Sequence, residues 1–127
     1  MSGGCYELSV KATFCAAHRV RGHRGGCANL HGHNWEVELR VSGETLDKTG
    51  FVIDFKDAKA ALREILERFD HRDLNAVGPF RKLNPTSERL AAFVFREAAR
   101  RLNGPACRVT GVCVAESAGA SVLYREP

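Results

Sequence analysis

CANLHGHNWEVELRV, residues 27–41, decides the fold, because it joins a loop rich in metal-binding side chains to a strongly alternating run. From residue 33 to 42 apolar and polar side chains alternate, which is the period of a β-strand with one buried face. We therefore predict a strand here, and its apolar side must be covered by another layer of the protein. That side carries Trp35, Val37, Leu39 and Val41.

A second alternating run precedes this strand in the chain. Residues 5–18 also follow a two-residue period and predict a strand. Between the two runs, residues 19–32 form a long loop of a kind that is usually functional in a compact protein. The apolar side of the first strand carries Tyr6, Leu8, Val10, Ala12, Phe14 and Ala16.

Two amphipathic helices are predicted in the middle of the chain. Asp54 is the expected N-cap of the first helix. Asn84 is the expected N-cap of the second, with Pro85 at its first helical position and its end at residues 103–105, NGP. The apolar positions that follow the helical period are Phe55, Ala58, Leu62, Ile65, Leu66 and Phe69, then Leu90, Phe93, Val94, Ala98 and Leu102.

Two further strands, at about 106–116 and 119–125, complete the order β-β-α-α-β-β. This order predicts an α+β fold, a four-stranded antiparallel sheet with both helices on one face. At 127 residues the chain is expected to form one domain, residues 1–127. The opposite face of the sheet should be too apolar for open water, so we expect an oligomer. Its residues include Cys107, Val109, Cys113, Ser121 and Leu123.

The charge pattern limits the partners that we expect. The chain has 44% apolar and 27% charged residues and a formal net charge of +4, as an ordinary globular protein can have. Only RVRGHR, residues 19–24, concentrates positive charge, and its place beside the Cys27 loop suits a phosphorylated small molecule at least as well as nucleic acid. The chain has neither an apolar run of membrane-spanning length nor an N-terminal secretory signal. We therefore expect a cytoplasmic protein with no membrane partner and no nucleic acid partner.

The five cysteines are odd in number and form no CxxC pair, which favours a reducing compartment over a disulfide framework. Four of them fall in strand-like runs and are expected to be small core residues. Only Cys27 lies in a glycine-rich basic loop, where the pKa of a thiol tends to fall. The other four are Cys5, Cys15, Cys107 and Cys113.

Three histidines are placed so that their side chains can share one face of the two predicted strands, as the ligands of a metal site would. His31 and His33 are two residues apart, so on a strand both imidazoles point to one face. His18 ends the first strand on its apolar side and meets them if the two strands pair as a hairpin. Three imidazoles with an open position are typical of a catalytic zinc site, whereas Cys27 as a fourth ligand would make the site structural. Each histidine alone also fits a hydrogen-bonded core residue, and His23 in the loop is expected at the surface.

Two further groups are candidates for proton transfer or ligand binding. Asp70 precedes His71 after the first helix, where a carboxylate can orient an imidazole, although capping of the helix end explains the same pair. Glu116 closes the third strand in phase with its apolar residues and should point inward. A buried carboxylate is costly unless it pairs with an arginine or binds a ligand.

Six short blocks occur in a fixed order along the chain. They are FCAAH (14–18), C-ANL-HGH (27–33), GFVIDF (50–55), DHRDLN (70–75), NPTSE (84–88) and Glu116. This set resembles the 6-pyruvoyl-tetrahydropterin synthase family over essentially the whole chain. The three residues between Cys27 and HGH are typical of its bacterial branch, the 6-carboxytetrahydropterin synthases, whereas the animal enzymes usually have five. A third branch, which makes a hydroxymethyl pterin, tends to carry glutamate in place of this cysteine.

The resemblance implies the tunnelling fold, or T-fold. In that fold the sheets of three subunits join into a barrel and two trimers stack into a homohexamer. It implies Zn²⁺ on His18, His31 and His33, with Cys27 as the catalytic thiol.

The other implied roles concern proton transfer and the substrate. Asp70 and His71 would transfer protons with the thiol across a subunit interface. Glu116 would hold the amino-pyrimidine edge of a pterin, and Thr86 and Ser87 would lie near the pterin at a helix start.

The implied reaction converts 7,8-dihydroneopterin triphosphate to 6-carboxy-5,6,7,8-tetrahydropterin, acetaldehyde and triphosphate, an early step towards queuosine. An animal-type synthase would instead eliminate triphosphate without cleaving a carbon–carbon bond. Outside the enzymes, the alternative is a zinc-stabilised module that binds an anionic partner through the basic loop. That alternative predicts a closed metal site with Cys27 as the fourth ligand.

Overall fold

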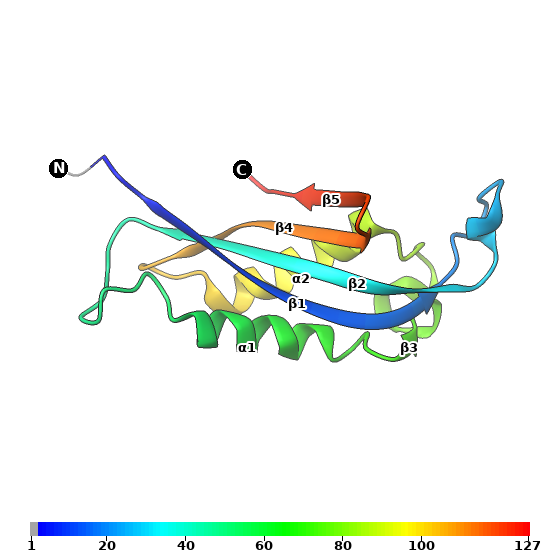
Figure 1. Ribbon diagram of the computed structural model, residues 1–127, viewed down its shortest axis with the longest axis horizontal. Coiled ribbons are helices and arrows are strands. Elements are labelled where there is room, and N and C mark those ends of the chain that lie inside the picture. Colours follow the sequence, from blue (N-terminus) through cyan, green and yellow to red (C-terminus); the bar gives the residue numbers. More distant parts are fainter. Residues whose placement is uncertain (1–2) are drawn as a thin grey trace.

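Two long strands form the centre of the sheet in the computed structural model, which describes residues 3–127. β1 (Tyr6–His18) and β2 (His31–Gly43) pair antiparallel along their whole length, from Tyr6 opposite Gly43 to His18 opposite His31. β2 therefore begins two residues earlier than its alternation indicates. The pairing brings one end of each strand to the loop at residues 19–30 (Figure 1).

The sheet has five strands in the order β3-β1-β2-β4-β5. β4 (Arg108–Ser117) and β5 (Ala120–Tyr124) form the predicted C-terminal hairpin. β3 (Arg72–Asp73) is an addition, which runs parallel to β1 with Arg72 opposite Ala16. The prediction of four purely antiparallel strands is wrong in this detail, because a two-residue strand has no alternation that could be recognised.

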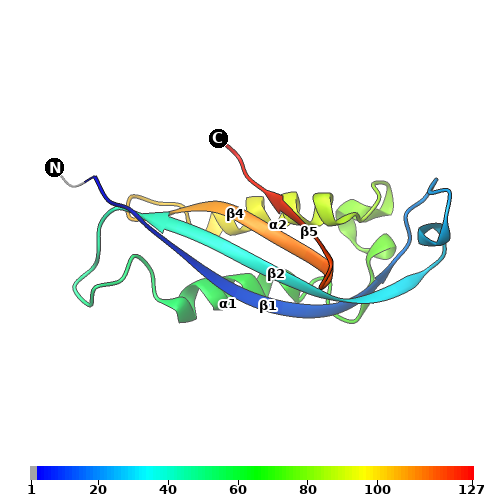
Figure 2. The same cartoon turned by 45° about the horizontal axis from the view of Figure 1, so that its top comes forward.

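Two helices, α1 (Phe55–Leu66) and α2 (Ser87–Leu102), cover one face of the sheet (Figures 1 and 2), which confirms the predicted α+β arrangement. Three 3₁₀ turns lie in the connections: η1 (Gly26–Ala28), η2 (Leu74–Ala76) and η3 (Gly78–Arg81). No helix in residues 3–127 combines the length and the apolar character that a membrane span requires. The core lies between the helices and the sheet, and its largest side chains are Trp35, Phe69, Phe80, Leu39 and Leu62.

The starts of the two helices differ in how well they follow the prediction. The Asp54 carboxylate accepts a hydrogen bond from the Lys56 N–H at 2.8 Å and caps α1 as expected. α2 begins two residues later than predicted, because the Thr86 hydroxyl, and not Asn84, caps it. Phe55, predicted to face inward, is 59% exposed, and burial on α1 begins one turn later at Ala58.

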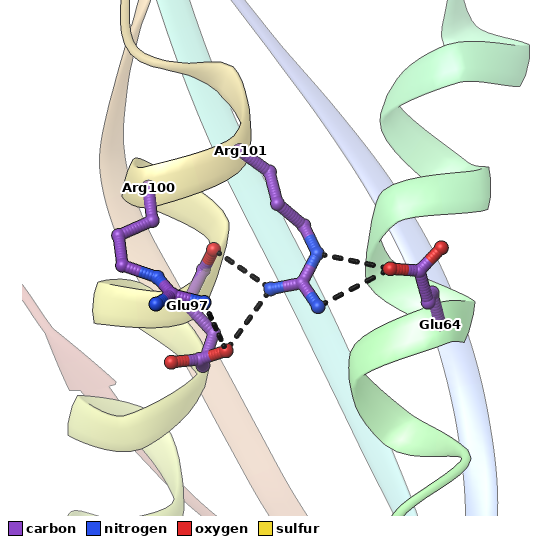
Figure 3. A network of polar contacts seen from close by, with 4 residues as sticks. All are labelled: Glu64, Glu97, Arg100 and Arg101. Atoms are coloured by element: carbon purple, nitrogen blue, oxygen red, sulfur yellow. Dashed lines mark hydrogen bonds and ion pairs between the residues drawn. The ribbon is translucent and has the colours of Figure 1, made fainter.

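An arginine near the end of α2 joins the two helices. Arg101 donates from Nε and Nη2 to Glu64 of α1, at 3.3 and 3.2 Å, and from Nη1 to Glu97 at 3.0 Å (Figure 3). Arg100 donates to the same Glu97 oxygen at 3.2 Å. Because Glu64 is largely exposed, its pair with Arg101 is worth at most about 1 kcal/mol. The network helps to hold the end of α2 beside α1.

The two helices leave the other face of the sheet open, and not every residue predicted there lies on it. Cys113 and Leu123 are cross-strand partners on this face. Val109, predicted beside them, is 1% exposed and belongs to the core, because the register of β2 against β4 shifts at residues 40–41. Such a bulge turns the following side chains to the opposite face. Conversely Cys15, predicted as a core residue, is exposed, and so is Cys5.

Candidate metal centre

Three histidines meet at the loop end of the β1–β2 hairpin. His18 lies opposite His31, and His33 lies opposite Ala16, so the three side chains share the helix-facing side of the sheet. The centre of the His18 ring stands 4.6 Å from that of His31 and 5.2 Å from that of His33, and the last two are 4.8 Å apart. The structure thus brings together the three imidazoles that strand phase selects.

Backbone carbonyls fix which ring nitrogen of two of these histidines is free. His18 Nδ1 lies 2.8 Å from the carbonyl oxygen of Pro85, and His31 Nδ1 lies 2.8 Å from that of Asn29. A carbonyl only accepts, so each Nδ1 carries the proton and donates it. The lone pair of each Nε2 is left uncommitted. Hydrogen bonds from Nδ1 to a backbone carbonyl are typical of histidines that bind a metal through Nε2, because they orient the ring.

The Nε2 atoms of His18 and His33 are buried and have no hydrogen-bond partner within residues 3–127. Glu116 Oε2 stands 2.9 Å from His33 Nε2 and 3.7 Å from His18 Nε2, which is ion-pair distance without hydrogen-bond geometry. One nitrogen of each of the three rings and one Glu116 oxygen all lie within 4.8 Å of one another. Glu116 thus faces imidazoles and pairs with no arginine in the described part of the chain.

The electrostatics favour the neutral, metal-binding form of the most buried ring. Burial lowers the pKa of His18 below its ordinary value of 6.5, and His31 and His33 lower it further. The Pro85 carbonyl and Glu116 act in the opposite direction without reversing the shift. Three imidazoles beside one carboxylate, with two buried nitrogens that lack a hydrogen-bond partner within residues 3–127, are a donor set that suits Zn²⁺. The residues present therefore fit the metal that the sequence leads us to expect.

Cys27 stands apart from these donors. It lies in η1 and is exposed, and its carbonyl accepts a hydrogen bond from the Val20 N–H at 2.7 Å. Its thiol belongs to neither group of metal-binding side chains found in residues 3–127. The geometry of this chain therefore does not close the histidine centre with a sulfur ligand.

Asp70 and His71 lie beside β1. The Asp70 carboxylate accepts a hydrogen bond from the Cys15 N–H at 3.0 Å and stands 3.0 Å from His71 Nδ1. The Cys15 N–H, followed by the His71 ring, lowers the pKa of Asp70 below its ordinary value. His71 has a φ of 60°, in the left-handed region that non-glycine residues seldom adopt. The Asp70 carboxylate and the His71 backbone are thus tied to the sheet, while the His71 side chain remains exposed to solvent.

Two asparagines hold the start of the loop after β1, Asn75, which sequence reasoning did not single out, and Asn84, which it expected only as a helix cap. Asn75 accepts from the Arg19 N–H at 2.8 Å and donates to the Arg19 carbonyl at 3.1 Å. Asn84 does the same for Arg21, with both distances 2.9 Å. Each side-chain amide thus pairs with both the N–H and the carbonyl of one loop residue, as the backbone of a neighbouring strand would. The only signal in the sequence is their place in DHRDLN and NPTSE.

Of the remaining residues of NPTSE, Pro85 contacts the histidine centre through its backbone. Pro85 supplies the carbonyl that orients His18. The Thr86 hydroxyl accepts a hydrogen bond from the Arg89 N–H at 3.3 Å, and Ser87 is 8% exposed in the first turn of α2. Thr86 and Ser87, which we expect near a ligand, directly follow Pro85, whose carbonyl contacts His18. The Thr86 hydroxyl already accepts a hydrogen bond from the α2 backbone.

A cleft of about 490 Å³ lies at the same end of the sheet. His33 of the first donor group and Cys15 and His71 of the second line it, with Asn34 and Arg72. A cleft of this size accommodates a small molecule. One residue of the histidine group and two of the second group thus line the same cleft.

The fold and this centre define a tunnelling-fold protein with a histidine-rich candidate metal site. The chain belongs to the 6-pyruvoyl tetrahydropterin synthase family, whose sequence profile matches residues 7–127.

Relatives of known name lie in several branches of this family. The chain is 31% identical over 112 residues to the 6-carboxy-5,6,7,8-tetrahydropterin synthase of Haemophilus influenzae, covering 71% of this chain and 79% of that one. It is 34% identical over 98 residues to the dihydroneopterin monophosphate aldolase of Pyrococcus furiosus, covering 77% and 79%. The structure of the 6-pyruvoyl tetrahydropterin synthase of Caenorhabditis elegans superposes with a TM-score of 0.86 at 26% identity, over 98% of this chain and 97% of that one.

Proposed function

We propose that the protein is a zinc-dependent 6-carboxy-5,6,7,8-tetrahydropterin synthase. It would convert 7,8-dihydroneopterin triphosphate and water to 6-carboxy-5,6,7,8-tetrahydropterin, acetaldehyde and triphosphate, an early step towards queuosine. The observation that carries this proposal is the group of three imidazoles, in which the buried Nε2 atoms of His18 and His33 have no hydrogen-bond partner within residues 3–127. The name of the Haemophilus influenzae relative and the three-residue spacing between Cys27 and HGH support the carboxy-forming reaction.

His18, His31 and His33 would hold the zinc ion. When bound there, zinc supplies a positive charge that lowers the pKa of hydroxyl groups on the substrate side chain. Pro85 and Asn29 keep the His18 and His31 rings oriented for this role through their carbonyls.

Cys27, as the thiolate, would remove the proton from the side-chain carbon next to the pterin ring. His71, oriented by the Asp70 carboxylate at 3.0 Å, would move protons during elimination of triphosphate and carbon–carbon cleavage. Glu116 would hold the amino-pyrimidine edge, with Thr86 and Ser87 near the pterin. The basic loop at residues 19–24 has the charge that a triphosphate requires. A catalytic free thiol favours a reducing compartment, so we place the enzyme in the cytoplasm.

The proposed assembly is a homohexamer with active sites at subunit interfaces. Two features support it. The thiol of Cys27 lies outside the group that contains Asp70 and His71 of the same chain, so a second chain would supply the missing half. β1 is 13 residues long, and β3 pairs with only two of them on its outer edge, which leaves a long edge for pairing with another sheet.

The test is a product assay on the zinc-loaded protein with 7,8-dihydroneopterin triphosphate. We expect 6-carboxytetrahydropterin by mass spectrometry and acetaldehyde in equal amount. A pyruvoyl pterin without acetaldehyde would make the protein an animal-type synthase instead. Turnover of the monophosphate alone would align it with the Pyrococcus furiosus relative.

Cys27→Ala separates the enzyme from the non-enzymatic zinc module. We expect this variant to keep its zinc content and fold while turnover falls at least about a thousandfold, because the base is missing. Metal analysis and the product assay are made on the same sample. A variant that loses its zinc and unfolds would support a structural site closed by Cys27, and near-normal turnover would remove the thiol from the mechanism.

A further inference from the structure

On the open face of the sheet, a second group of metal-binding side chains remains outside the histidine centre. Cys15 Sγ, a carboxylate oxygen of Asp70 and a ring nitrogen of His71 all lie within 4.8 Å of one another. Cys15 points away from the histidine centre, because its neighbours Phe14 and Ala16 are buried on the helix-facing side. The proposed function gives Cys15 no role.

The backbone holds these three residues together although 55 positions separate Cys15 from Asp70. The Cys15 N–H donates to Asp70 Oδ1, and the Cys15 carbonyl accepts from the His71 N–H. The parallel bridge between β1 and β3 continues this pairing one residue further. His71 keeps its left-handed φ of 60° within this frame. The site is therefore built into the tertiary structure and is not a chance encounter of surface side chains.

The donor atoms are available for a ligand. Asp70 Oδ1 is engaged, but Oδ2 has no partner within the described residues. The His71 side chain is 79% exposed, and the Cys15 thiol donates a hydrogen bond to the Asn34 amide oxygen at 2.9 Å. Tetrahedral zinc–sulfur, zinc–nitrogen and zinc–oxygen bonds place ligand atoms about 3.3 to 3.6 Å apart. The present donor atoms lie within 4.8 Å of one another, so binding requires an adjustment of side chains, for which the 79% exposed His71 has room.

We propose that Cys15, Asp70 and His71 form a second, solvent-accessible site for a thiophilic divalent cation such as Zn²⁺ or Cd²⁺. A thiolate, an imidazole and a carboxylate are ligands that these cations accept together, and water completes the coordination. One consequence rests on the proposed function: a cation here occupies the Asp70–His71 pair, so excess zinc inhibits the enzyme.

The binding test uses the full chain and Cd²⁺ alone. A cadmium–thiolate bond gives an ultraviolet charge-transfer band that imidazole ligands do not give, so the band reports the second site. We expect the band in the wild type and in Cys27→Ser, and its loss in Cys15→Ser. Asp70→Asn and His71→Asn should weaken Cd²⁺ binding at least about tenfold, and asparagine tolerates the left-handed backbone at position 71. These two variants also decide the question if Cys15→Ser fails to fold.

Three results would overturn the site. They are a full band in Cys15→Ser, loss of the band in Cys27→Ser alone, and wild-type Cd²⁺ affinity in both Asp70→Asn and His71→Asn. The inhibition is tested separately, by adding Zn²⁺ beyond one equivalent to the active wild type and to Cys15→Ser, which should be less sensitive. A protein without pterin turnover would refute the proposed function and leave the cadmium result standing.

Discussion

A single carbonyl decides which nitrogen of His18 is free. Because Pro85 accepts the Nδ1 proton at 2.8 Å, Nε2 faces the other two imidazoles with its lone pair. The residue is 2% exposed, so protonation would place a buried charge among other rings, which the Glu116 carboxylate at 3.7 Å offsets only in part. This explains why burial lowers the pKa of His18.

The lowered pKa predicts how the stability of the metal-free protein depends on pH. The unfolded chain protonates His18 near its ordinary pKa of 6.5, whereas the folded chain resists protonation until a lower pH. Between these values the unfolded state binds more protons, so the free energy of unfolding falls as the pH falls below about 6.5. Urea unfolding in the presence of a chelator, from about pH 8 to 5, measures this slope.

The matched variant for this prediction is His18→Gln, which should be less stable but should show a flatter dependence on pH. His23→Gln serves as the control, because His23 lies in the loop and is exposed. If the free energy of unfolding depends equally on pH in the wild type and in His18→Gln, the pKa of His18 is the same in the folded and unfolded states and the prediction is wrong.

At the scale of elements, the loop after β1 is held by amides from the segments that precede α2. Asn75 and Asn84 bind alternate loop residues, Arg19 and Arg21, through both a donor and an acceptor. The Arg21 guanidinium adds hydrogen bonds to the carbonyls of Phe80 and Arg81, at 3.0 and 3.1 Å. The loop that carries Cys27 is therefore anchored at its start.

Removing one of these anchors should loosen the loop without disturbing the core. We expect Asn84→Ala to lower the free energy of unfolding by about 1 to 3 kcal/mol, because two partly buried hydrogen bonds are lost. Alkylation of Cys27, followed by mass spectrometry, should become faster. Asn29→Ala is the control, since within the described residues Asn29 is engaged only through its backbone, by its carbonyl with His31 and by its N–H with the Gly26 carbonyl. Unchanged stability and alkylation in Asn84→Ala would contradict the anchoring role.

At the scale of the whole molecule, one chain contains every residue that the proposed reaction needs but does not assemble them in one place. Glu116 and the histidines form one group, Asp70 and His71 belong to another, and Cys27 belongs to neither. The long outer edge of β1 and the open sheet face leave room for neighbouring subunits (Figure 2). Assembly would then complete each active site.

This arrangement predicts complementation between two inactive variants. We expect a homohexamer of about 84 kDa by sedimentation, six times the 14.0 kDa of the chain. Co-refolded Cys27→Ala and His71→Asn chains should recover roughly a quarter of wild-type turnover, because random mixing places an intact Cys27 beside an intact His71 in that fraction of interfaces. Asp70→Asn mixed with His71→Asn should stay inactive, since both changes affect the same half-site. A monomer, or mixed hexamers without recovery, would refute sites shared between chains.

Local periodicity in the sequence determined the strands, the two helices and the shared face of His18, His31 and His33, because these follow from the geometry of a strand or helix within a few residues. The family resemblance, now supported by the match over residues 7–127, added the expected fold. Only the tertiary structure decided the Pro85 carbonyl on His18, the asparagine anchors of the loop, the bulge that buries Val109 and the approach of Cys15 to Asp70. The contacts of Pro85, the asparagines and Asp70 join residues at least 55 positions apart, and the bulge depends on how β2 and β4 pair. Neither these long-range contacts nor the bulge produces a periodic pattern in the sequence, because both result from packing between elements and not from the order of neighbouring side chains.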